Sequence, residues 1–298
     1  MAYSRWIPFG VKSWPYRKLR ANYDEVNRLM IANKAATLFT CQELAQKGAT
    51  DMSAASQYIH VGKGNAKLTI KDWHRSYTLF NNWTYLNAIM ALSSSFEAYL
   101  TAIITMAIDS DPGMIINAPK SVDGIAQLKF GEEFKKELVE SKIIDCTKGE
   151  WSARTSAMKS LFGHIPAVLS DSIADLDKLR ALRNKVGHAF GRDIDRAKDY
   201  MPFRIDPMVK LDWTRFRKYQ SLILRCSSQL DIQLQNEHIG LFHYLRFYHD
   251  HYTEIEKFPV EIDRHVHYKY LIGQVSKCAI PKSLAQFVVN YYESLKSK

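Results

Sequence analysis

The most chemically suggestive stretch of the sequence runs from Lys178 to Asp193, KLRALRNKVGHAFGRD. In it, four residues separate Arg183 from His188, and Asn184 directly follows the arginine. A histidine can donate or accept a proton near neutral pH. An arginine stays charged and can offer two donors to phosphate oxygens. These residue types predict proton transfer at a phosphate ester, with Asn184 orienting His188 or contacting the phosphate.

The spacing of this pair restricts how it can act. In an unbroken helix, five steps rotate by about 500°, which leaves the two side chains about 140° apart. They can meet on one substrate if the helix ends near Gly187 and turns His188 back, because glycine permits such a turn at low cost. Alternatively, the paired groups come from two chains across a symmetric interface. Structural alternatives are an arginine that favours a helix C-terminus and an ordinary turn histidine.

Long helices are expected to position these residues, because apolar residues recur at helical spacing and no convincing alternation of period two is visible. We predict an all-α fold, a bundle of long helices with additional N- and C-terminal helices. The expected divisions are residues 1–69, 70–235 and 236–298. The expected helices span 17–47, 69–108, 121–141, 151–162, a segment that Pro166 opens and that frays near Gly187 or Gly191, 213–235, and two or three segments in 237–298.

A glutamate lies on the apolar stripe of the 69–108 segment. Glu97 falls in register with the apolar residues Leu86, Met90, Leu100 and Ile104. A buried carboxylate must find a partner. We therefore expect an ion pair of Glu97 with Arg183 or Arg180 that fixes the arginine rotamer. The alternative is a half-exposed Glu97 that pairs with an unrelated lysine.

The charge balance favours polyanionic partners. The 298 residues contain 41 Lys and Arg against 31 Asp and Glu, a net charge of +10. Residues 5–20 carry no acid, and Trp6, Trp14 and Tyr16 lie between their cations. Cations and aromatic faces together suit single-stranded RNA; the alternative is a terminal arm whose aromatic rings pack on the bundle. The expected RNA contacts in this arm are Arg5, Lys12, Arg17, Lys18 and Arg20.

Several classes of protein are disfavoured by the same composition. The apolar segment 86–108 has Glu97 at its centre, which favours a buried core helix over a membrane span. The first residues lack a secretory apolar region. The four cysteines form no C-x-x-C pair and are expected as free thiols in the cytoplasm. Six histidines lie between His238 and His267, without the ligand spacing of a zinc site. We expect no metal, no cofactor and no membrane partner.

The Arg-Asn-x-x-x-His pattern at the end of an amphipathic helix resembles the R-x4-6-H signature of HEPN domains (higher eukaryotes and prokaryotes nucleotide-binding). The segments SSSFEAYL around Glu97 and CSSQLDIQLQNEHIG after the motif are also similar to that family, so the resemblance covers roughly residues 70 to 245. It implies a HEPN-like helical core and a metal-independent endoribonuclease with catalytic Arg183 and His188. Lys185 and Arg192 beside the motif are expected to contact RNA.

The resemblance also implies an oligomeric state, reaction products and partners. One motif per chain implies a homodimer with a composite active site, and the expected products are a 2′,3′-cyclic phosphate and a 5′-OH. A toxin or anti-phage defence effector of this kind would have an antitoxin or a sensor as a partner. Two other functions stay open: a non-catalytic HEPN-like module that binds RNA or protein, and a helical interaction protein.

The chain contains a second match to the pattern. Arg246 and His251, in RFYHDH, have the same spacing as Arg183 and His188. This second match lies in an aromatic-rich segment, which we interpret as core or as a packing surface. The two matches therefore differ in context and not in spacing.

Overall fold

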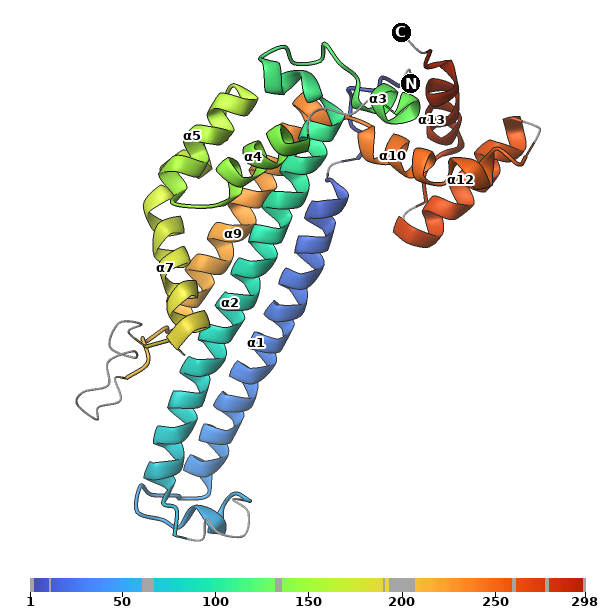
Figure 1. Cartoon of the computed structure of the whole chain (residues 1–298). Helices are drawn as coiled ribbons and strands as arrows, with labels where there is room; N and C mark the ends of the chain where they lie inside the picture. Colours follow the sequence, from blue (N-terminus) through green and yellow to red (C-terminus); the bar gives the residue numbers. More distant parts are fainter. Residues whose placement is uncertain are drawn as a thin grey trace. The chain divides into compact units, whose positions relative to one another are not determined.

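Helices form the secondary structure of the computed structural model, which describes residues 3–10, 12–60, 67–131, 136–189, 191–192, 207–258, 261–276 and 279–296 (Figure 1). The described residues contain no strand; Ala54 and Thr69 form an isolated bridge. This confirms the predicted all-α class.

The chain divides into two compact units, each built from segments that are distant in sequence. Unit 1 comprises Met1–Leu19, Phe96–Ala174 and Leu224–Lys298, and unit 2 comprises Arg20–Ser95 and Asp175–Ile223. Three long helices contribute residues to both units: α1 (Trp14–Gln46), α2 (Ile70–Ser110) and α9 (Trp213–Leu234). Each unit therefore combines residues from more than one of the three divisions expected from the sequence.

Unit 2 contains the motif and is built around an antiparallel pair of helices. α1 and α2 run side by side (Figure 1), and Asn33 Nδ2 donates to Asn81 Oδ1 at 3.0 Å between them. At their far end, Leu44, Ala55 and Ile70 form a small buried cluster with the short helix η1 (Ala55–Gln57). α7 (Ile173–Ala189) contributes its residues from Asp175 onward.

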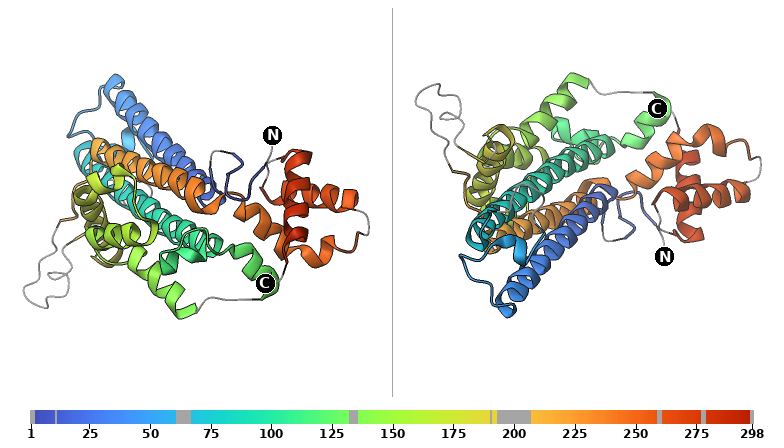
Figure 2. Two further views of the ribbon diagram at one scale, coloured as in Figure 1. Left: turned by 90° about the horizontal axis from the view of Figure 1, so that it is seen from above. Right: turned by 90° about the horizontal axis from the view of Figure 1, so that it is seen from below.

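Unit 1 contains the shorter helices. α4 packs against α5, and α10 lies against both α3 and α13, which in turn packs on α12 (Figure 2). The bounds of these helices are η2 (Pro112–Ile116), α3 (Gly124–Phe130), α4 (Lys136–Thr147), α5 (Trp151–Phe162), α6 (Ala167–Asp171), the π-helical turn η3 (Gln235–Ile239), α10 (Phe242–Asp250), α11 (Tyr252–Ile255), α12 (Glu261–Ser276) and α13 (Lys282–Ser294).

Some helix boundaries differ from those expected, because they depend on local signals that the spacing of apolar residues does not reveal. The expected helix 121–141 is wrong, because α3 ends at Gly131, whose φ of 70° is the left-handed conformation typical of a helix C-terminus. The segment that Pro166 opens is also broken, at Ser172 between α6 and α7. α1 begins three residues earlier than expected, because Ser13 Oγ accepts from the backbone N–H of Tyr16.

α2 is the one helix among the described residues that is long and apolar enough to cross a membrane, and 44% of its most apolar window is buried. Several of its side chains, including Ile89, Leu92, Ile103 and Ile104, are fully buried. A core helix of a soluble protein has the same properties, so the cytoplasmic location stays a prediction.

Candidate functional site

α7 positions the motif by burying one face and exposing the other. Its buried residues recur at helical spacing: Leu176, Leu179, Leu182 and Val186. Arg183 and Asn184 are half-buried at the edge of this face, whereas Lys185 and His188 are exposed. His188 is therefore accessible to a large substrate.

The expected turn at Gly187 is wrong. α7 continues through Gly187 to Ala189, and the positive φ belongs instead to Gly191, at 76°. The backbone N–H of Gly191 donates to Lys185 O at 2.9 Å after the helix has ended. Because His188 is still within the helix, its Cα–Cβ direction stays about 140° from that of Arg183. The turned-back His188 is therefore not observed, and the arrangement with two chains stays a prediction.

Asn184 contacts one of the two motif residues and lies on the helix face of the other. Arg183 Nη1 donates to Asn184 Oδ1 at 3.0 Å. Asn184 and His188 are four residues apart and share one face of the helix. The long arginine side chain thus reaches the amide one turn before His188, although the two backbone positions point in different directions.

Glu97 and Arg180, expected as supporting residues, have other contacts. Arg154 Nη2 lies 3.9 Å from Glu97 Oε1, in unit 1, and the Arg154 side chain is only 5% exposed. A buried guanidinium needs a counter-charge, so Glu97 supports α5 through Arg154. Arg180 Nε donates to Asp177 Oδ1 at 3.2 Å.

Arg5, expected to bind RNA, is a structural residue. It is 2% exposed, and its guanidinium donates to Ile239 O at 2.8 Å, to Ser110 O at 2.9 Å and to Asp123 Oδ1 at 3.1 Å. Burial lowers its pKa, an effect that Asp123 opposes. The expectation of an RNA contact is therefore wrong for Arg5, because its donors point into the protein.

The other residues of the arm agree in part with the alternative in which the arm packs on the bundle. Lys12 Nζ donates to Ser228 O at 2.9 Å, and burial lowers its pKa. Trp14 packs edge-on against the rings of His243, Tyr244 and Phe247. This leaves accessible cations whose RNA contacts stay predictions: Arg17, half-buried; Lys18, exposed; Arg20, exposed and paired with Asp24 at 2.9 Å; and, beside the motif, Lys185 and the half-buried Arg192.

A buried Asp–His pair was not expected from the sequence. Asp111 Oδ2 and His238 Nδ1 lie 2.9 Å apart, both side chains are buried, and His238 Nε2 has no hydrogen-bond partner. Since the two residues are 127 positions apart in the sequence, no local pattern could have indicated this pair. Its burial makes it a link between the end of α2 and the η3 turn rather than a site open to a substrate.

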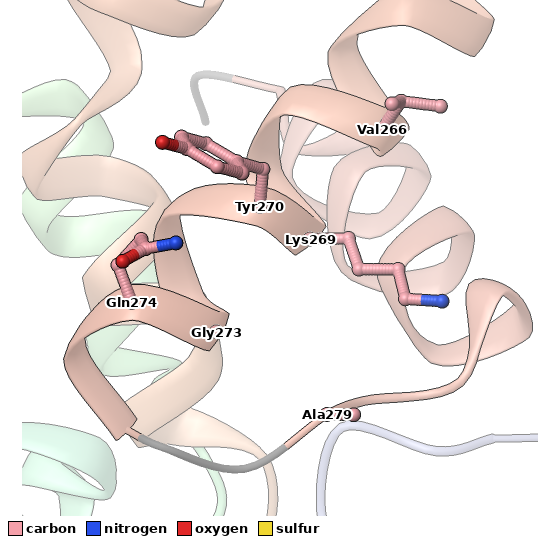
Figure 3. A pocket seen from close by; sticks show the side chains of 6 residues that line it. All are labelled: Val266, Lys269, Tyr270, Gly273, Gln274 and Ala279. Atoms are coloured by element: carbon pink, nitrogen blue, oxygen red, sulfur yellow. The ribbon is translucent and has the colours of Figure 1, made fainter.

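A shallow pocket of about 480 Å³ lies on α12. Figure 3 shows its lining side chains, five of them on that helix: Val266, Lys269, Tyr270, Gly273 and Gln274, with Ala279. It offers one cation and one phenol but neither carboxylate nor histidine. In the part of the chain that the structure describes, no group of three His, Cys, Asp or Glu residues could hold a metal ion.

Comparisons with models of protein families, with curated proteins and with solved structures found no match to this chain. The resemblance to HEPN domains therefore rests on the residues quoted above, and membership of that family stays a prediction.

Proposed function

We propose that this chain is a metal-independent endoribonuclease of the HEPN type that acts as a toxin or an anti-phage defence effector. The observation that supports this proposal best is the exposed His188 on the same helix face as Asn184, which accepts a hydrogen bond from Arg183. A histidine and an amide thus share one face of an accessible helix end, and the amide is bonded to a cation.

The reaction follows from the roles of these residues. One histidine removes the proton of the 2′-OH, and the 2′-oxygen forms a bond to phosphorus as the bond from phosphorus to the 5′-oxygen breaks. The same histidine then donates a proton to the leaving 5′-oxygen. Arg183 stabilises the charge that builds on the phosphate oxygens. The products are a 2′,3′-cyclic phosphate and a 5′-OH.

Two copies of the chain supply two sites of this kind. Because His188 stays within α7 and points away from Arg183, we place the site between two chains, with the arginine of one copy acting beside the histidine of the other. The homodimer is thus part of the proposed mechanism.

RNA cleavage by the purified full-length chain in EDTA tests this function. We expect cleavage to continue in EDTA, with the two product ends named above, and to fall by about 10² to 10⁴-fold in His188→Ala. The matched control is His164→Ala, because His164 is an exposed histidine of unit 1, 63% exposed, and this variant should cut as the parent does.

Circular dichroism and solution mass establish that His188→Ala is folded. A folded His188→Ala protein that cuts RNA like the parent contradicts the proposal. A parent that binds RNA in a salt-sensitive way without cutting it also contradicts the proposal and supports a non-catalytic RNA-binding module.

A further inference from the structure

One side of α12 carries polar groups that bind nothing in the part of the chain that the structure describes. Lys269 makes no ion pair there, and neither the hydroxyl of Tyr270 nor the amide of Gln274 makes a hydrogen bond. All three side chains line the pocket of about 480 Å³ (Figure 3). Ligand pockets are concave sites of roughly this size that contain a few polar groups among apolar ones.

The sides of α12 that face the rest of unit 1 are different, because their polar groups are bonded within the protein. Arg264 Nε donates to Phe258 O at 2.7 Å. The hydroxyl of Tyr268 donates to Tyr244 O at 2.9 Å. The polar groups on the pocket side are therefore available to a ligand, whereas these are not.

A glycine lies at the centre of the pocket side. Each helical residue turns by about 100°, so Val266 and Gly273, seven residues apart, point in nearly the same direction. Lys269 then lies on one edge of this direction. Tyr270 and Gln274 lie on the other edge. Figure 3 shows this arrangement, with the lysine on one side of the helix and the tyrosine and glutamine on the other.

Packing does not explain Gly273. A Cβ there would meet no heavy atom within 4 Å. Gly273 is not among the described glycines with a positive φ, so it does not end the helix, which continues to Ser276. A glycine in a helix is destabilising relative to alanine. What the missing side chain provides is an open floor between Lys269 and Tyr270, where a flat group can approach the helix backbone.

The apolar surface around this floor suits a flat ring. Tyr270 is 61% exposed and Val266 is 58% exposed, and Ala279 closes the pocket beyond Gly273. The ring of Tyr270 lies against His267 with centroids 6.4 Å apart, so its orientation is supported from within α12. Aromatic rings bind other rings by offset stacking or edge-on contact.

The charge of the pocket suits a single negative charge. Lys269 is the one cation among its lining residues, which include no carboxylate. The lysine lies one turn before Gly273, away from the C-terminal end of α12, where the carbonyl groups disfavour anions. A phosphate is normally bound by several cations or by a helix N-terminus. A carboxylate therefore fits this pocket better than a phosphate does.

We propose that the pocket on α12 binds a small aromatic carboxylate. The ring lies over Gly273 and against Tyr270, and the carboxylate binds Lys269. The amide of Gln274 is placed to bind a polar substituent of the ring. The pocket belongs to unit 1 and the arginine–histidine motif to unit 2, and the binding of this ligand does not depend on the proposed nuclease.

Titration of the full-length chain with naphthoate, followed by calorimetry and NMR, tests the pocket. We expect saturable binding with a dissociation constant of about 1 mM or lower, as is typical of ligands of this size. Lys269→Ala should weaken binding at least about 10-fold, because a charge-assisted contact is lost. Lys159→Ala is the matched control, since Lys159 is an exposed lysine of α5 in the same unit, and it should bind as the parent does.

Gly273→Leu is the sharper variant. Its side chain should fill the pocket and abolish binding, while the melting temperature stays the same or rises, because leucine favours a helix more than glycine does. A Gly273→Leu protein of unchanged melting temperature that binds naphthoate like the parent overturns the proposal.

Three further results also overturn it. One is a parent that shows no saturable binding at about 10 mM naphthoate. Another is equal affinity for the neutral alcohol with the same rings, since Lys269 would then recognise no charge. The third is adenosine monophosphate that displaces naphthoate and binds more tightly, which would assign the pocket to a nucleotide. None of these results bears on RNA cleavage, so the pocket and the nuclease can fail separately.

Discussion

The chain carries an arginine and a histidine twice at the same spacing, and the two places differ in their surroundings. On α7, Arg183 binds the neutral amide of Asn184, and His188 is exposed. On α10, Arg246 Nε binds the carboxylate of Asp250 at 2.8 Å. There, His251 Nδ1 donates to Phe247 O at 2.9 Å and its ring stacks on Phe247 with centroids 4.2 Å apart.

This difference shows that the residues around a short motif decide whether its side chains are available to a substrate. The carboxylate next to Arg246 competes with any phosphate, and the proton on His251 Nδ1 is held by the backbone. The amide next to Arg183 carries no charge and repels no phosphate. The α10 match therefore fits the packing role expected from its aromatic sequence.

Removal of each arginine should give the largest contrast between the two places. We expect Arg183→Ala to lower RNA cleavage by about 10² to 10³-fold, because a charge-assisted contact to the phosphate is lost in the transition state. Arg246→Ala should change cleavage less than about two-fold and cost at most about 1 kcal/mol of stability, since its ion pair is exposed. Initial rates of cleavage of one RNA substrate measure the effect of each substitution. Equal losses in the two variants would contradict the expected difference between the two places.

A mixture of two inactive variants tests whether the α7 site is shared between chains. Arg183→Ala and His188→Ala, refolded together, form a mixed dimer in which one of the two sites keeps an intact arginine and an intact histidine. Random pairing restores roughly a quarter of the parent's activity if each site acts alone, which exceeds either variant by about 25-fold or more. Mixtures no more active than the separate proteins would place both groups in the same chain.

The acid sensitivity of folding should report on the buried side of α10. His243 on α10 is 3% exposed, and burial, with smaller contributions from Arg17 and Arg5, lowers its pKa from 6.5 to about 3. The folded state keeps this ring neutral, whereas the unfolded chain binds a proton below pH 6.5. Stability therefore falls as the pH drops from about 6.5 toward 3, by about 2 kcal/mol at pH 5.

Urea unfolding at pH 7 and pH 5 measures this loss. His243→Phe should remove the contribution of about 2 kcal/mol. A parent and a His243→Phe variant that lose the same stability between the two pH values would show that this ring is not held neutral.

The sequence predicted the long elements because burial imposes a period on them. α2 buries apolar residues at helical spacing from Leu86 to Ile108, and the expected bounds 69–108 are close to Ile70–Ser110. The interruption between α3 and α4 was missed because it depends on the conformation of one glycine, Gly131, which no period reveals. Gly187 shows the opposite case: a glycine that permits a turn and remains helical.

Side-chain partners were predicted less well, because the partners are far apart in the sequence. The arginine that approaches Glu97 is 57 positions farther along the chain, and the histidine that meets Asp111 is 127 positions away. A pattern in one sequence carries no information on such pairs until the helices are placed. The exposure of His188, in contrast, follows from the amphipathic pattern of α7 itself, so the motif could be proposed as a site before its surroundings were seen.

The contacts of Arg5 have a consequence for synthesis on the ribosome. This side chain is bonded to groups 105, 118 and 234 positions later in the chain. The segment around Arg5 therefore cannot form these contacts until the residues around Ile239 have left the ribosome. Contacts between positions so far apart in the sequence slow folding. Until those partners have been synthesised, chaperones and proteases have access to the segment around Arg5.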